Sequence, residues 1–175
     1  MELYLITGFL GAGKTTFLKN FARQFAGRRL RLIINEFGRA GVDGTLLREL
    51  DAALDEISNG SIFCACRLDQ FEAALEQAAA DAPDVVLVEA SGLADPTNVR
   101  RVLAQFPAVS YQGSVCVADA ARLEKVFSTA RACPRQLAVS SLVLLNKTDL
   151  ATEAQCAEAK ALILRANPAA RIRRT

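Results

Sequence analysis

A glycine-rich segment near the N-terminus limits the folds open to this chain more than any other feature. Its sequence, Gly8-Phe9-Leu10-Gly11-Ala12-Gly13-Lys14-Thr15, fits the pattern GxxxxGK[ST]. It lies between an apolar run, Leu3–Ile6, and a helix-like segment, which is the strand–loop–helix context that this pattern requires. The sequence therefore predicts a P-loop, and with it a nucleoside triphosphate as ligand.

Each residue type in this loop has its own task. The glycines let successive backbone N–H groups turn toward phosphate oxygens. Lys14 neutralises the outer phosphates and is a predicted catalytic residue, and the Thr15 hydroxyl is a predicted Mg²⁺ ligand. The predicted nucleotide contacts here are Gly8, Gly11, Ala12, Gly13, Lys14, Thr15 and Thr16.

Apolar runs of strand length alternate with helical patterns along the chain. Helices are expected over about 14–25 and 71–80. The expected strands are 3–7, 30–35, 84–90, 114–118 and 142–146, with the start of one more at 170–174. Because the runs are nearly continuous rather than alternating, they favour a mostly parallel sheet covered by helices on both faces. We therefore expect one doubly wound α/β domain over residues 1–175.

Composition excludes several classes of protein. Lys and Arg number 21 against 19 Asp and Glu, so the net charge of +2 gives no reason to expect a nucleic-acid partner. The basic segment 171–174 is interpreted as a solvated strand end. No secretory signal is visible and no apolar run approaches the ~20 residues that a bilayer requires, so we expect a soluble, cytoplasmic protein. Its five cysteines should then be reduced, with Cys116 and Cys156 in the core.

A polar motif, Asn146-Lys147-Thr148-Asp149, directly follows the apolar run 142–145 and matches the pattern NKxD. A carboxylate at Asp149 can accept hydrogen bonds from both N1–H and the exocyclic amine of guanine, whereas N1 of adenine is itself an acceptor. Asn146 would support the loop and the base edge, and the Lys147 stem would lie along the ring. The motif predicts that the base is guanine.

An acidic residue, Glu89, closes the apolar run 85–88 and is followed by Ala90-Ser91-Gly92. This is the Walker B arrangement, in which the carboxylate holds Mg²⁺ directly or through water. We predict Glu89 as a catalytic and Mg²⁺-binding residue, and Gly92 as an N–H donor to the terminal phosphate.

Two further segments carry weaker signals. The loop after the second strand holds Glu36 and Asp43, either of which can orient the attacking water or contact Mg²⁺ indirectly; an Asx-turn is the alternative for Asp43. We predict Asp43 as catalytic.

Cys64 and Cys66 lie one residue apart beside a turn. With Glu36 they form a partial site for Zn²⁺ or another transition metal, and the alternative interpretation is that they are two buried free thiols.

The chain resembles the CobW/HypB/UreG family of GTPases, and its CobW-like branch in particular, in five motifs. These are GFLGAGKTT, NEFG…GVD, NGSIFCACR, VEASGLADP and NKTD, in the family's order. The resemblance implies a GTPase that uses GTP and Mg²⁺ and helps to insert a metal or metal cofactor into a client metalloprotein or cofactor-dependent enzyme. It also implies a GTP-dependent homodimer.

The chain departs from the family pattern in two places. The family's CxCC metal motif, aligned on Asn59-Gly60, falls on Ser61, Phe63 and Cys64, so only the last cysteine is kept and Cys66 is added. The family commonly has a further C-terminal domain, often His-rich, and this chain contains no histidine. We therefore expect a nucleotide-binding domain without that C-terminal domain, either as the nucleotide domain of a longer protein or as a naturally minimal version.

Three functions fit these motifs. The leading one is a GTPase with slow intrinsic turnover, since no arginine finger is identifiable apart from Arg39. A P-loop small-molecule kinase is the second, although it would need an acceptor pocket and has no use for NKTD. The third is a non-catalytic metal carrier whose conformation is set by nucleotide.

Overall fold

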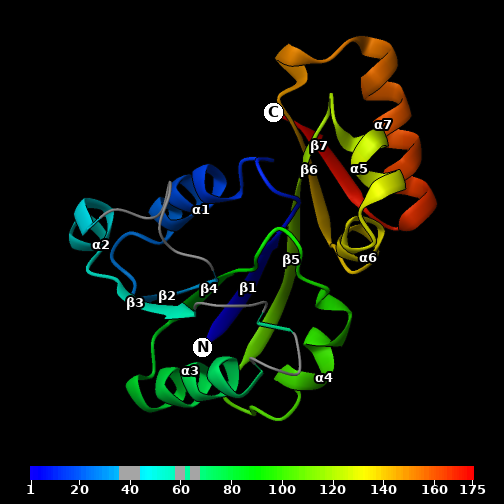
Figure 1. Ribbon diagram of the computed structural model, residues 1–175. Helices are drawn as coiled ribbons and strands as arrows, with labels where there is room; N and C mark the ends of the chain where they lie inside the picture. The colour runs from blue at the N-terminus through cyan, green and yellow to red at the C-terminus, as the bar shows by residue number, and fades with distance from the viewer. Residues whose placement is uncertain (36–43, 58–61, 64–67) are drawn as a thin grey trace.

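The computed structural model describes residues 1–35, 44–57, 62–63 and 68–175 (Figure 1). These form one seven-stranded sheet in the order β3-β2-β4-β1-β5-β6-β7. Every pairing of neighbouring strands is parallel. The strands are β1 (Glu2–Thr7), β2 (Leu30–Asn35), β3 (Ala53–Ile57), β4 (Val85–Glu89), β5 (Ser110–Asp119), β6 (Leu142–Asn146) and β7 (Arg171–Arg174). The expectation of a doubly wound, P-loop-type α/β fold is confirmed.

Helices cover both faces of the sheet. The α-helices are α1 (Lys14–Ala22), α2 (Gly44–Leu50), α3 (Leu68–Asp81), α4 (Val99–Leu103), α5 (Leu123–Thr129), α6 (Ala132–Ala138) and α7 (Glu153–Ala166). The short 3₁₀ segments are η1 (Arg23–Phe25), η2 (Pro96–Asn98) and η3 (Thr148–Leu150). Strand residues of β1, β2 and β4 pack with α3 and α4 on one face and with α1 on the other, whereas α5, α6 and α7 cover β5 and β6 (Figure 1).

The continuous apolar runs form strands that are buried on both faces of the sheet. In β1, β2 and β4 side chains of both faces are buried, because each face has its own helical layer. Cys116 and Cys156 are buried, as expected, in the apolar cluster that β5 and β6 form with α5, α6 and α7. Residues 171–174 form the largely exposed edge strand β7. Within the described ranges no helix is long and apolar enough to cross a membrane.

Strand β3 at the opposite edge was not expected, because its sequence ALDEI is short and half-exposed. It is attached to β2 partly by an ion pair. The Arg31 guanidinium is 7 % exposed and donates to Asp55 on β3, with Nη2 2.8 Å from Oδ1, and also to Asp81 at the end of α3. The buried guanidinium thus joins β3 and the end of α3 to β2 at this edge of the sheet.

Candidate nucleotide-binding site

The P-loop connects β1 to α1 and has a backbone that only glycine permits at its turning points. Gly8 has φ +136°, and a Cβ there would lie 2.2 Å from the backbone oxygen of Val117. Gly13 has φ +106°, and its Cβ would lie 2.5 Å from Asn146 Nδ2. A side chain at Gly8 would therefore force the loop away from β5, and one at Gly13 would strain the backbone and displace the Asn146 amide. The loop is thus held against the carboxyl ends of two neighbouring strands.

Lys14 and Thr15 begin α1 directly behind this loop. The Lys14 side chain is buried, and Nζ lies 3.5 Å from the carbonyl oxygen of Phe9, so the ammonium group reaches back across the loop. The Thr15 hydroxyl donates to Oε1 of Glu89 at 2.9 Å. Thr16 follows on the exposed side of the helix. The pairing of β1 with β4 places Glu89 opposite Ile6, two residues before the loop, so the predicted Walker B acid and phosphate loop do meet.

Glu89 has the properties of a metal-binding carboxylate. Its side chain is buried, and burial raises its pKa above the usual glutamate value, although the hydrogen bond from Thr15 and the charge of Lys14 oppose that shift. Its second oxygen, Oε2, is buried and has no hydrogen-bond partner among the described residues. A buried acceptor without a partner is costly unless a cation or water satisfies it. Thr15 and Glu89 therefore fit a Mg²⁺ ion beside the phosphate loop.

The NKTD segment is hydrogen-bonded to the same loop. Asn146 Nδ2 donates to the carbonyl oxygen of Ala12 at 2.8 Å, and Lys147 Nζ donates to that of Gly11 at 2.7 Å. Lys147 has φ +59°, and this left-handed residue turns the chain from β6 into η3. Asp149 lies in η3 with its side chain exposed and with no hydrogen bond or ion pair to any described residue. Its carboxylate is available to a ligand.

The structure adds residues that sequence reasoning missed. Asp119 ends β5 opposite Asn146 in the strand register, and its Oδ2 accepts from Lys147 Nζ at 2.9 Å. The Thr175 hydroxyl donates to Oδ1 of Asn146 at 3.0 Å. The rule that found Glu89, an acid closing an apolar run, would have found Asp119. No comparable signal marks Thr175, because it reaches the loop through the pairing of β7 with β6.

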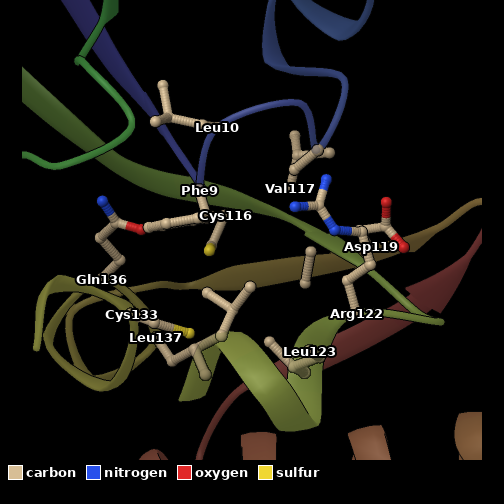
Figure 2. A pocket seen from close by; sticks show the side chains of 13 residues that line it. Phe9, Leu10, Cys116, Val117, Asp119, Arg122, Leu123, Cys133, Gln136 and Leu137 are labelled. Atoms are coloured by element: carbon tan, nitrogen blue, oxygen red, sulfur yellow. The ribbon is translucent and has the colours of Figure 1, made fainter. Parts of the chain in front are cut away.

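Arg122 places a guanidinium group next to the phosphate loop. A Cβ on Gly11 would lie 3.5 Å from its Nη1, and Figure 2 shows its side chain directed from the start of α5 toward the loop. The side chain is exposed, and no ion pair joins it to the part of the chain that the structure describes. Arg39, the arginine considered from sequence, lies outside the described residues.

Gly92 lies against the opposite side of the phosphate loop. A Cβ there would be 2.7 Å from the backbone nitrogen of Leu10, a contact that only glycine allows. Gly92 is buried, and its N–H donates to no acceptor among the described residues. This is the arrangement expected of a backbone donor that awaits an anionic ligand.

Four predicted residues, Glu36, Asp43, Cys64 and Cys66, lie outside the described residues. Within 1–35, 44–57, 62–63 and 68–175 there is no group of three or more His, Cys, Asp or Glu side chains that could hold a metal ion. The catalytic assignment of Asp43 and the transition-metal assignment of Glu36 and the two cysteines stay predictions.

A small apolar cavity lies behind the phosphate loop, between Phe9 and the helices α5 and α6 (Figure 2). It measures about 20 Å³, room for roughly one water molecule and far too little for a nucleotide. Cys116 and Cys133 line it, and burial raises their pKa values to about 11 and about 12, so both are protonated thiols at neutral pH. This cavity is therefore too small to be a nucleotide site.

Comparison with known proteins agrees with this geometry. The family model described as CobW/HypB/UreG, nucleotide-binding domain, matches residues 2–174. The zinc chaperone CobW of Pseudomonas aeruginosa is 32 % identical over 97 % of this chain and 55 % of its own length. The zinc chaperone YeiR of Escherichia coli is 33 % identical over 85 % of this chain and 47 % of its own length. The chain thus spans about half the length of these relatives.

Solved structures share the fold. Zn(II)-bound YjiA GTPase from Escherichia coli superposes with a TM-score of 0.73 at 23 % identity, covering 99 % of this chain and 57 % of that one. The hydrogenase maturation factor HypB from Archaeoglobus fulgidus gives a TM-score of 0.64 at 21 % identity, covering 100 % and 81 %. The family match over nearly all residues, together with the joined phosphate and base motifs, leads to one conclusion: the chain belongs to the CobW/HypB/UreG family and comprises its nucleotide-binding domain.

Proposed function

We propose that this chain binds GTP with Mg²⁺ and hydrolyses it to GDP and phosphate. The observation that carries the proposal is the pair of hydrogen bonds from Asn146 and Lys147 to the carbonyls of Ala12 and Gly11. They make the guanine-reading segment and the phosphate loop a single site. A small-molecule kinase would share the phosphate loop, but it would have no use for a guanine reader fixed to it.

Hydrolysis requires little covalent chemistry from the protein. A water oxygen forms a bond to the γ-phosphorus, the bond from that phosphorus to the β–γ bridging oxygen breaks, and the water's proton passes to the phosphate product. Lys14 offsets charge on the outer phosphates, and the Gly92 N–H donates to the terminal phosphate. We assign orientation of the water to Asp43 or Glu36. Asp149 selects guanine, and Asn146 and Lys147 support the base.

Thr15 and Glu89 would hold the Mg²⁺ ion, Thr15 through its hydroxyl and Glu89 through its carboxylate. When bound, the ion neutralises charge on the β- and γ-phosphate oxygens. Glu89 is suited to this because its Oε1 already accepts from Thr15 while Oε2 has no partner among the residues described. Burial raises the pKa of this carboxyl group, and a bound cation would oppose that shift.

Substituting Glu89→Gln is expected to have opposite effects on stability and activity. The raised pKa means that the folded apoprotein keeps a proton that the unfolded chain has released, so its stability falls as pH rises from 4.5 through the raised value. Glutamine removes this loss, and the melting temperature of the apoprotein at pH 7 should rise by about 2–4 °C. Mg²⁺-dependent GTP hydrolysis should fall about 100-fold.

Thermal melts from pH 4 to 8 and single-turnover hydrolysis measure the two effects. Glu158→Gln, which changes an exposed acid on α7, is the matched control and should alter neither. A Glu89→Gln variant that hydrolyses GTP at the wild-type rate would contradict the assignment of Glu89 as a Mg²⁺ ligand.

The second part of the proposal concerns a transition metal that this chain would bind and deliver. Relatives in this family are named zinc chaperones, and one from Dictyostelium discoideum is named zinc-regulated GTPase metalloprotein activator 1. We propose that Cys64 and Cys66, with Glu36, bind Zn²⁺ or a similar ion, and that GTP hydrolysis controls its transfer to a client metalloprotein or cofactor-dependent enzyme. A GTP-dependent homodimer and a cytoplasmic location complete the proposal.

Zinc affinity tests this part. In a chelator competition with Mg²⁺ and either GDP or a non-hydrolysable GTP analogue, Cys64→Ser/Cys66→Ser should weaken Zn²⁺ binding by about 100-fold, since thiolates are the preferred ligands. Affinity should also differ between the two nucleotides. Cys156→Ser, at a buried position on α7, is the control. Zinc binding that ignores both thiols would remove the metal role from this chain and leave the GTPase assignment standing.

A further inference from the structure

Several hydrogen bonds hold the segment 91–95, which joins β4 to η2. The Ser91 N–H donates to Oδ1 of Asn35 at 3.3 Å, and the Ala94 N–H donates to the Ser91 carbonyl at 3.1 Å. Asp95 caps η2 by accepting from the Thr97 N–H at 3.2 Å. The N–H groups of Gly92, Leu93 and Asp95 donate to no acceptor among the described residues, and of these three residues only Gly92 is buried.

One buried side chain from a distant helix fixes the middle of this segment. Gln136 on α6 is 1 % exposed, and its Nε2 donates to the Gly92 carbonyl at 3.2 Å and to the Ala94 carbonyl at 3.0 Å. Figure 2 shows its amide extending from α6 toward the phosphate loop. We propose that Gln136 is a positioning residue for recognition of the terminal phosphate, acting by holding segment 91–95 so that the Gly92 N–H faces that phosphate.

The neighbouring ion pair does not account for the same effect. Arg135 on α6 also reaches this segment, through Asp95, but its side chain is 56 % exposed and that of Asp95 is 35 % exposed. Exposed pairs of this kind contribute little, because solvent screens the charges. The amide of Gln136 is shielded from water, and losing it would leave two buried carbonyl oxygens without their donor. Gln136 therefore dominates the connection.

Gln136 is also not needed to hold α6 itself. Asn167, at the end of α7, donates through Nδ2 to the carbonyls of Leu137 and Ser140 at 3.1 and 2.8 Å. Leu137 is fully buried in the cluster formed with β5 and β6. The helix is thus anchored from its far end, and the hydrogen bonds that Gln136 Nε2 donates to described residues both go to segment 91–95.

This inference rests on the proposed GTPase function, because it assigns the terminal phosphate as the ligand of Gly92. It predicts an effect that separates GTP from GDP. In Gln136→Leu the affinity for a non-hydrolysable GTP analogue should fall about tenfold, as expected when the hydrogen bond from the Gly92 N–H to the terminal phosphate is lost. Affinity for GDP should stay within about twofold, because GDP has no terminal phosphate. Single-turnover hydrolysis of GTP should slow by about tenfold or more.

Arg135→Ala is the matched control, since it removes the exposed ion pair with Asp95 and keeps the Gln136 amide. It should leave the ratio of GTP-analogue to GDP affinity unchanged. If Gln136→Leu does not fold, Gln136→Met, which keeps the unbranched chain and lacks the amide, replaces it. Fluorescent-nucleotide titrations and melting curves on the full chain provide all readouts.

Two results would overturn the inference in distinguishable ways. Equal losses of GTP-analogue and GDP affinity in Gln136→Leu, or no loss of either, would show that Gln136 has only a structural role, while the wild-type GTPase assignment stands. Failure of the wild-type chain to bind guanine nucleotides with Mg²⁺ would instead remove the proposed function, and the inference with it.

Discussion

Replacing Lys14 by alanine is expected to reduce GTP hydrolysis about 1,000-fold, or ~4 kcal/mol of transition-state stabilisation. The Lys14 ammonium is buried and reaches back over the phosphate loop to the Phe9 carbonyl. A charge held in a poorly hydrated site acts on the phosphates with little screening. The substitution also removes the cation that opposes the raised pKa of Glu89, so the carboxylate intended for Mg²⁺ would be protonated to still higher pH.

Single-turnover hydrolysis and nucleotide titration measure the loss. Lys160→Ala, which removes an exposed ammonium from α7, is the control and should leave both unchanged. Wild-type affinity and turnover in Lys14→Ala would refute the placement of the phosphates at this loop.

The substitution Asp149→Asn should weaken GTP binding about 1,000-fold, or ~4 kcal/mol. The Asp149 carboxylate can accept from both N1–H and the exocyclic amine of guanine, whereas the asparagine amide presents one acceptor and places a donor against the amine. Asp149 is exposed and has no partner among the described residues, so the substitution should leave the fold intact.

Xanthosine triphosphate provides a test within the same variant. Xanthine carries a carbonyl where guanine carries the exocyclic amine, so an asparagine amide can donate to it. Asp149→Asn should therefore prefer xanthosine triphosphate over GTP, and the wild-type chain the reverse. Equal GTP affinity in the two proteins would exclude Asp149 as the base reader.

The central part of the fold could be predicted because its strands are covered on both faces. Strands β1, β2, β4, β5 and β6 carry continuous apolar runs, and the α1 and α3 patterns have helical spacing. Strand β3 was missed, since its attachment depends partly on the pairing of Asp55 with Arg31, a contact between distant positions that no periodicity reveals. The short helix α6 was also missed, although it carries Gln136.

Sequence motifs predicted a candidate site at positions where one residue type and one spacing are tied to a particular chemistry. The structure brings together Lys14, Thr15, Glu89 and Asn146 around the phosphate loop as the motifs indicated. The motifs did not identify the residues that orient the site. The Gln136 amide, for example, contacts backbone carbonyls that are far away in sequence. Such contacts depend on how α6 packs, and that is decided by the whole core.

The order of the strands also sets a length. Glu89 ends β4 and Asn146 ends β6, and β1 and β5 lie between them, so three strand spacings separate the predicted Mg²⁺-binding acid from the predicted base-binding motif. At about 4.8 Å each, these spacings add up to a distance of about 14 Å along the edge of the sheet. Under the proposed function, a nucleotide would contact both positions at once, whereas free phosphate or free guanosine could contact only one of them. The strand order therefore predicts that an intact guanine nucleotide binds much more tightly than either of its parts.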